Sequence, residues 1–193
     1  MNNSFPLDMG QFGNVLFSTR IPQKDIDFIQ KGPEDTKHVA VFYKGRAYKV
    51  DAFDEAFVPR DPSLILADLE AIKADGDERG FEVNAVCALS STERNRWAEN
   101  RERLVKLGNS ESLDLIDHSM FTLVLDDYAY LEPGDCCKQH IAGPAQNRWP
   151  DKSFSVVMGH DGKAGVVFEH AWGDGAAVLH FMNSINDQVI RFL

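Results

Sequence analysis

The sequence has 193 residues and a formal net charge of −10, and 44% of its residues are hydrophobic. This composition is typical of a globular protein with a hydrophobic core, not of a disordered or fibrous chain. The negative charge argues against nucleic acid or an anionic membrane surface as the main partner, and no apolar stretch approaches the roughly 20 residues that span a bilayer.

The N-terminal part is expected to be irregular. Glycines and prolines interrupt every apolar periodicity in residues 1–37, which predicts loops. Met1–Pro6 lacks a positive segment followed by an apolar one, so neither a secretory signal nor another targeting segment is expected. Beyond it, His38–Tyr43 and Arg46–Phe53 alternate apolar and polar residues around Lys44-Gly45, which predicts a β-hairpin.

Capping signals predict two helices in the next segment. Asp61-Pro62 places an acid at the cap and proline at the first helical position. A polar loop is expected over Asp75–Gly80. Ser90–Glu93 has the capping-box pattern ahead of a charged helix over Thr92–Leu107. Gly108 is expected to end that helix.

The remaining apolar runs are short. Val83–Leu89 and Met120–Leu125 are almost continuously apolar, which predicts buried strands. Ser153–Met158 and Gly165–Phe168 flank a polar turn and predict a second hairpin. Residues 126–150 are expected to form a long loop. Helices and hairpins without regular βαβ alternation predict a layered α/β or α+β fold.

His170 is the strongest candidate for chemistry. It ends a predicted strand and stands four residues before Asp174-Gly175. An imidazole exchanges protons near neutral pH, so His170 could act as a general base. Asp174 could hold the turn by pairing with a buried arginine, and Gly175 would let the next helix start close to the strand. The alternative stays open, because histidines at strand ends are often structural and Asp-Gly is a common turn.

Other chemistry is poorly supported by the sequence. The remaining histidines lack the spacing and third ligand of a metal site, so no metal is expected. These histidines are His38, His118, His140, His160 and His180. No G-x-S-x-G elbow or phosphate-binding glycine loop is present. Cys87 and the adjacent Cys136-Cys137 are expected to be reduced, structural thiols.

Two paired motifs carry a resemblance to a known family. Asn147–Phe154 reads N-R-W-P-D-K-S-F, and Phe168–Gly175 reads F-E-H-A-W-G-D-G. Together they strongly resemble the carnitine/choline acyltransferase family, in which an N-R-W-x-D-K-[ST] segment precedes the strand of the catalytic histidine. Phe17–Pro22 and Leu89–Trp97 are similar to two further family segments. Trp172–Gly175 most resembles the type II, palmitoyl-transferring branch found in mitochondria.

The resemblance implies a CoA-dependent acyltransferase fold, chloramphenicol acetyltransferase-like, with a mixed sheet and flanking helices. Residues 1–193 would form part of one acyltransferase domain that lacks its N-terminal portion and its second half. His170 would take the hydroxyl proton of carnitine, which then attacks the thioester of a long-chain acyl-CoA. The coenzyme A thioester is a substrate, so no cofactor is implied. Asp174 and Gly175 would support the catalytic histidine.

The resemblance also implies what the chain lacks. The family's oxyanion donors and its carnitine and CoA sites would lie beyond residue 193, so no CoA-binding residue is expected here. The chain alone is therefore expected to be inactive and to expose apolar surface. Arg148 and Asp151 are expected to brace the histidine strand. A location at the matrix side of the mitochondrial inner membrane is implied, with peripheral membrane association of the full-length protein.

Two alternative functions remain open at this stage. The first is another carnitine or choline acyltransferase, which would use a shorter acyl chain or a choline acceptor. The second is a non-catalytic chain that only packs against or binds a partner through its half-interface.

Overall fold

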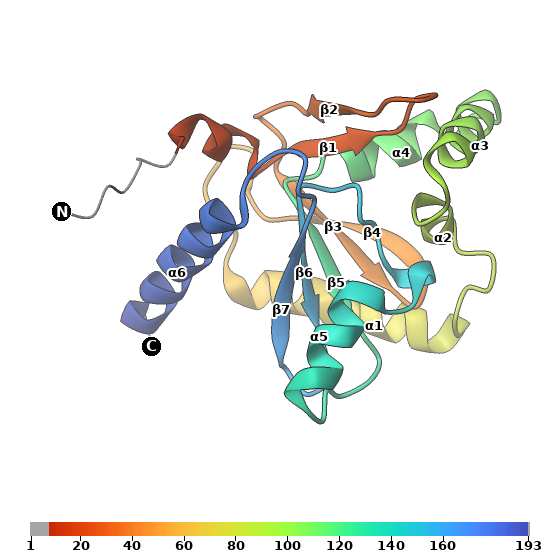
Figure 1. Ribbon diagram of the computed structural model, residues 1–193. Helices are drawn as coiled ribbons and strands as arrows, with labels where there is room; N and C mark the ends of the chain where they lie inside the picture. Colours follow the sequence, from red (N-terminus) through yellow and green to blue (C-terminus); the bar gives the residue numbers. More distant parts are fainter. Residues whose placement is uncertain (1–7, 193) are drawn as a thin grey trace.

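A mixed sheet of five strands, in the order β4-β3-β5-β6-β7, forms the centre of the structure (Figure 1). Three strands run parallel, and the two edge strands each pair antiparallel with their neighbour. The strands are β3 (His38–Tyr43), β4 (Arg46–Asp51), β5 (Thr122–Leu125), β6 (Phe154–Met158) and β7 (Ala164–Phe168). The predicted mixed sheet with flanking helices is confirmed.

This computed structural model describes residues 8–192. The prediction for Met1–Pro6 therefore lies outside the described residues. Both predicted hairpins are present. Lys44 and Gly45 have φ values of 46° and 80°, and a two-residue turn with positive φ at both positions matches the twist of the strands that it joins.

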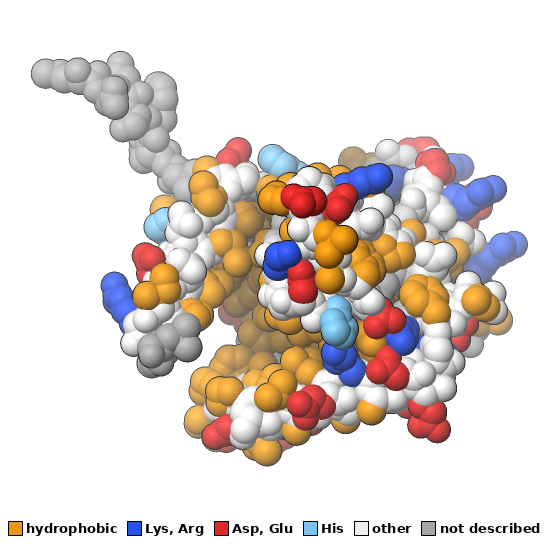
Figure 2. Space-filling model, turned by 90° about the horizontal axis from the view of Figure 1, so that it is seen from below, with side chains coloured by type: hydrophobic (Ala, Val, Ile, Leu, Met, Phe, Trp, Pro, Cys, Tyr) orange, Lys and Arg blue, Asp and Glu red, His pale blue; other side chains and the backbone are white. Residues whose placement is uncertain are grey.

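Six α-helices surround the sheet in the described residues. They are α1 (Pro62–Arg79), α2 (Cys87–Ser90), α3 (Arg94–Lys106), α4 (Ser110–Asp117), α5 (Pro133–Ala142) and α6 (Gly175–Phe192). α6 packs through one side only, where Phe181 meets the ring of Phe154 at 5.7 Å between centroids. A hollow with apolar walls separates α6 from the rest of the molecule (Figure 2).

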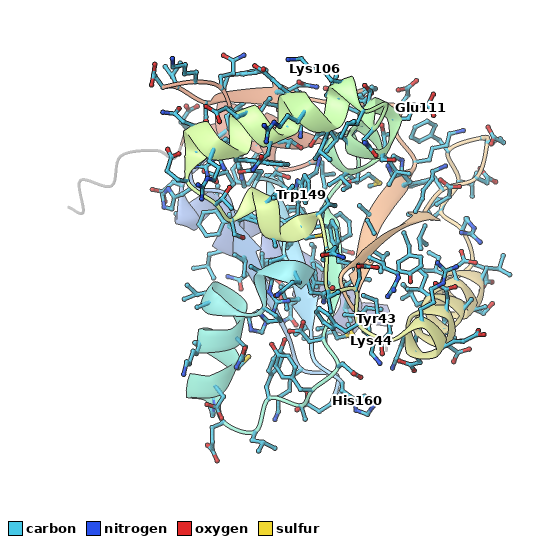
Figure 3. The ribbon with its side chains drawn as sticks, turned by 90° about the vertical axis from the view of Figure 1, so that its right-hand side faces the viewer. Tyr43, Lys44, Lys106, Glu111, Trp149 and His160 are labelled. Atoms are coloured by element: carbon cyan, nitrogen blue, oxygen red, sulfur yellow. The ribbon has the colours of Figure 1, made fainter. Side chains whose placement is uncertain are left out.

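The sheet has a hydrophobic core on each face. On one face, α1 covers β3 and β4, with Val41, Tyr43 and Ile72 buried between them. On the other face, Trp97 of α3 and Trp149 pack edge to face at 5.6 Å, and both are almost fully buried. Trp149 lies beside α2 and α3, in the interior (Figure 3). This aromatic contact attaches α3 to the sheet through one face, while most residues of this charged helix stay at least partly exposed.

The prediction that residues 1–37 are loops is wrong for the described part of that segment. It contains a short 3-10 helix, η1 (Met9–Asn14), and an antiparallel ribbon of β1 (Ser18–Ile21) and β2 (Phe28–Lys31). Thr19 forms a β-bridge with Lys152, and both are buried. The ribbon depends on this long-range pairing, which no local pattern encodes.

The predicted loop over Asp75–Gly80 is wrong, because α1 continues to Arg79. The last turns of α1 face β3: the Tyr43 hydroxyl donates to Asp77 at 2.7 Å. A Cβ at Gly76 would lie 2.5 Å from Tyr43 Cδ1, so only glycine allows the helix to approach this closely. Tertiary contacts therefore extend a helix through a polar sequence.

The capping box at Ser90 is also wrong. Glu93 caps α3, and its carboxylate accepts from the backbone N–H groups of Asn95 and Arg96 at 2.9 and 3.0 Å. The Ser90 hydroxyl instead donates to the Cys87 carbonyl at 2.6 Å. The predicted strand over Val83–Leu89 is replaced by turns and the short helix α2.

The long loop over residues 126–150 contains α5 and a second 3-10 helix, η2 (Ala145–Asn147). Pro133 stands in the first turn of α5, where its missing N–H is no loss. Within residues 8–192, no helix is both long and apolar enough to cross a bilayer.

Candidate active site

His170 lies in the connection between β7 and α6, which runs beside β1 (Figure 1). Its side chain is exposed to solvent. The imidazole ring packs against Phe168, the last residue of β7, with 5.2 Å between ring centroids and 34° between planes. The ring is therefore supported on one side and open to a reactant on the other.

One backbone carbonyl holds the turn on both sides of His170. The Ser153 oxygen accepts from the Glu169 N–H at 3.0 Å and from the Trp172 indole N–H at 2.7 Å. Trp172 is only 5% exposed, so its ring anchors the turn in the hydrophobic cluster under α6. The backbone that carries His170 is thus attached to the residue just before β6.

Glu169 is directed into the protein, and its side chain is only 10% exposed. One carboxylate oxygen accepts from the Ala171 N–H at 3.0 Å. The other lies 3.3 Å from Nε of Arg20 in β1. Arg20 belongs to the segment Phe17–Pro22, so the sequence did carry a signal for this contact, but not the identity of its partner.

Asp174 caps α6. Its carboxylate accepts from the Ala176 N–H at 2.7 Å, and its own N–H donates to the side chain of Gln11 at 2.7 Å. In the described residues Asp174 forms no ion pair, so its pairing with a buried arginine stays a prediction. An exposed carboxylate at the first turn satisfies free helix N–H groups, which explains this position.

Gly175 is the first residue of α6. A Cβ added here would lie 3.5 Å from Phe168 Cζ, which is an ordinary contact distance. The helix does start close to β7, as predicted, although sterics at this contact do not demand glycine.

Arg148 and Asp151 lie in two separate polar networks. Arg148 binds Asp126 through two hydrogen bonds of 2.8 and 2.7 Å, beyond the carboxyl end of β5. Burial opposes ionisation of Asp126, but the bonds from Arg148 and Tyr130 outweigh it and lower the pKa of this carboxyl. This pair lies at the end of the parallel strands opposite to the His170 turn.

Asp151 lies at the same end of the parallel strands as the His170 turn. It accepts from the Trp97 indole at 2.7 Å, from Arg94 at 2.7 Å and from Arg20 at 3.4 Å. Burial raises the pKa of Asp151, against the opposing effect of Arg94 and Trp97. Asp151 therefore joins the core at Trp97 to Arg20, and through Arg20 to the His170 turn.

The described residues contain no cluster of histidine, cysteine and acidic side chains that could hold a metal ion. His140 is buried between two carbonyl oxygens, with Nδ1 2.6 Å from Cys136 and Nε2 3.1 Å from Val157. The three cysteines are free, and burial raises the pKa of the Cys87 thiol to about 12.

The arrangement offers one exposed imidazole on a fixed turn. It can accept a proton from a substrate hydroxyl brought to its open side. In the part of the chain that the structure describes, no second side chain hydrogen-bonds to the imidazole. This turn thus offers a single exposed imidazole, a group with the chemistry of a general base.

Comparison with known proteins gives a family and a set of relatives. The model of the choline/carnitine O-acyltransferase family matches residues 1–191. Carnitine O-palmitoyltransferase 2, mitochondrial, of Mus musculus is 39% identical over 185 residues, which are 95% of this chain and 27% of that protein. The protein of the same name in Xenopus tropicalis is 39% identical over 186 residues, 96% of this chain and 28% of that protein.

A second kind of relative is more distant. Carnitine O-palmitoyltransferase 1, muscle isoform, of Bos taurus is 32% identical over 188 residues, 91% of this chain and 24% of that protein. The chain therefore spans about a quarter of the length of the curated relatives that it matches.

Proposed function

The chain belongs to the choline/carnitine O-acyltransferase family, and on this basis we propose that it supplies the general base, His170, of an enzyme that transfers long-chain acyl groups between coenzyme A and carnitine. The observation that carries the proposal is the exposed imidazole on a turn fixed by the Ser153 carbonyl. The names of the relatives support carnitine as acceptor, palmitoyl as acyl group and a mitochondrial location. Attachment to the matrix side of the inner membrane is part of the proposal.

In the proposed reaction, His170 carries one proton from the carnitine hydroxyl to the sulfur of coenzyme A. The imidazole takes the proton of the carnitine hydroxyl as its oxygen forms a bond to the thioester carbonyl carbon. The tetrahedral intermediate then collapses, the carbon–sulfur bond breaks, and the imidazolium returns the proton to the sulfur of coenzyme A. The products are acylcarnitine and free coenzyme A, and the histidine is unchanged.

His170 can perform this step only with partners that the described residues do not supply. The chain spans about a quarter of its relatives, so the oxyanion donors and the substrate sites are proposed to lie in other segments of a full-length protein. Asp174 and Gly175 serve the base indirectly, because they begin α6 next to the strand that carries it.

The test is the turnover of palmitoyl transfer in a full-length protein that carries these residues. His170→Ala should lower kcat by about 10²–10⁴-fold, the usual contribution of a positioned general base. His160→Ala is the matched control, because His160 is also an exposed histidine in a turn but lies at the opposite end of the sheet from β1 and β2 (Figure 3). Loss of activity in both variants, or in neither, would reject the assignment of His170.

A further inference from the structure

We propose that Glu169 and Arg20 form a positioning pair that fixes the orientation of the His170 imidazole. The pair deepens the proposed function, and its catalytic meaning rests on that function. Neither residue reaches the exposed side of the turn, so the pair acts through His170 and touches no substrate.

Glu169 bends around the backbone of His170. Its carboxylate accepts from the Ala171 N–H at 3.0 Å. This bond joins the residue before His170 to the residue after it. The Glu169 N–H is held by the Ser153 carbonyl at 3.0 Å. Together these bonds restrict the backbone dihedral angles of His170, and those angles determine where its imidazole projects.

Arg20 attaches this carboxylate to the interior. Its Nε lies 3.3 Å from Glu169, 3.4 Å from Asp151 and 3.5 Å from Asp27. Asp151 is 1% exposed and is bonded to the Trp97 indole at 2.7 Å. A continuous chain of contacts thus runs from a buried tryptophan through Asp151 and Arg20 to Glu169 and the turn.

The Glu169 carboxylate depends on Arg20 for a positive countercharge. Asp27 and Asp151 also pair with Arg94, at 2.7 Å each. Glu169 has Arg20 as its ion-pair partner, and its side chain is only 10% exposed. A largely buried carboxylate without a countercharge is unstable, so removing the charge on Arg20 should release Glu169 from the turn.

Small displacements of a base matter for catalysis. A misplacement of about 1 Å in a reacting group can lower a rate by about 10²-fold. The Ser153 carbonyl fixes the start of the turn and the Trp172 ring, while the Glu169–Arg20 pair fixes the segment between them. Loosening the pair should therefore disturb the imidazole while the fold persists.

The first test needs no activity. In NMR spectra of the 193-residue chain, the His170 ring signals are assigned by their absence in His170→Gln. The Phe168 ring should displace them from the positions of a free histidine, because the two rings lie 5.2 Å apart. Glu169→Gln and Arg20→Gln should each move these signals toward the free positions, while signals from the strands stay in place.

Glu82→Gln is the matched control. Glu82 also accepts from the backbone N–H two residues ahead, at 3.0 Å, and also lies 3.4 Å from an arginine, Arg46. This variant should leave the His170 signals unchanged. Unmoved His170 signals in both Glu169→Gln and Arg20→Gln, or an equal movement in Glu82→Gln, would overturn the proposal.

The second test uses turnover in a full-length protein that carries these residues. Glu169→Gln should lower kcat by about 10- to 100-fold with little change in KM, because the base is misplaced and substrate binding is not. Arg20→Lys, which keeps the charge, should restore most of the rate that Arg20→Gln loses.

The outcomes separate the two proposals. If His170→Ala retains full activity, the proposed function fails, but the NMR test of the pair still decides its own claim. If His170→Ala is inactive and Glu169→Gln is as fast as wild type, the positioning role is rejected and the function stands.

Discussion

Asp174 shows what a single residue of the H-x-x-x-D-G motif does in this fold. Its carboxylate accepts the Ala176 N–H at the start of α6, where the helix has no internal acceptor. The helix that it caps covers Trp172 and Phe154, which lie under the His170 turn. In the described residues, Asp174 therefore acts on the start of α6 and forms no ion pair with an arginine.

Asp174→Ala should lower the free energy of unfolding by about 1 kcal/mol, the usual loss for an N-cap carboxylate. The measurement is urea denaturation of the 193-residue chain. Asp187→Ala, at an exposed position inside the same helix, is the control and should change stability by less than about 0.5 kcal/mol. Equal effects of the two variants would show that Asp174 does not act as a cap.

At this scale the sequence singled out His170, whose catalytic role stays a prediction, but it did not reveal the contacts of the turn that carries it. A histidine after an apolar run, followed by Asp-Gly, is a local pattern, and the family motif sharpened its role. Glu169 pairs with Arg20, the Trp172 indole with the Ser153 carbonyl, and the Asp174 N–H with Gln11. Each of these partners is distant in the sequence. Only the fold brings these groups together, so no spacing rule could name them.

At the scale of elements, one buried lysine joins the N-terminal ribbon to the sheet. Lys152 is 1% exposed, and its ammonium donates to the Asp117 carbonyl at 2.7 Å and to the Thr19 hydroxyl at 3.1 Å. Burial lowers the pKa of Lys152 to about 7, with Asp117 opposing the change. The contact between β1 and the end of α4 is thus sensitive to pH.

The sign of this effect follows from proton binding. Above about pH 7 the folded chain loses the Lys152 proton, whereas the unfolded chain keeps it up to its ordinary value of 10.5. The unfolded state then binds more protons, so the free energy of unfolding rises with pH. Relative to Lys152→Met, wild type should gain about 1 kcal/mol per pH unit between about pH 7 and 9.

Denaturation curves at several pH values measure this difference. Lys106→Met is the control, because Lys106 is an exposed lysine on α3 (Figure 3). A pH-independent difference for Lys152→Met would mean that the buried lysine does not titrate in this range.

Elements with strong local signals were predicted correctly, and those that depend on distant contacts were not. The Lys44-Gly45 turn and the Asp61 cap are local, so the first hairpin and the start of α1 agree with the sequence. The β1–β2 ribbon relies on the bridge between Thr19 and Lys152. The end of α1 relies on Tyr43, which the polar sequence of that segment does not reveal.

At the scale of the whole molecule, α6 leaves apolar surface exposed. Leu179, Val189 and Ile190 are 62%, 50% and 62% exposed, and apolar side chains line the hollow beside this helix (Figure 2). Contiguous apolar surface of this kind favours association. The 193-residue chain is therefore expected to self-associate in solution.

Replacing two of these residues tests the expectation. Leu179→Gln combined with Ile190→Gln should shift the chain toward monomer in size-exclusion chromatography without lowering its stability. Val178 lies on the packed face of α6 and is only 8% exposed, so Val178→Gln should instead destabilise the fold. A monomeric wild-type chain, or no shift in the double variant, would contradict this account of the surface.

The separate 193-residue chain should also be inactive. It holds the proposed base, but a base without oxyanion donors and substrate sites lacks most of the stabilisation of the transition state. The assay is the formation of palmitoylcarnitine from palmitoyl-CoA and carnitine. Detectable, protein-dependent product would show that the described residues hold more of the active site than a general base.

The most direct measurement of the central claim is chemical rescue of His170→Ala in a full-length protein that carries these residues. Palmitoyl transfer should fall by about 10²–10⁴-fold, and free imidazole added to the assay should restore part of the rate in this variant alone. Such a result would identify the missing group as an imidazole that moves a proton. Retention of more than about a tenth of wild-type turnover without imidazole would contradict the claim that His170 is the base.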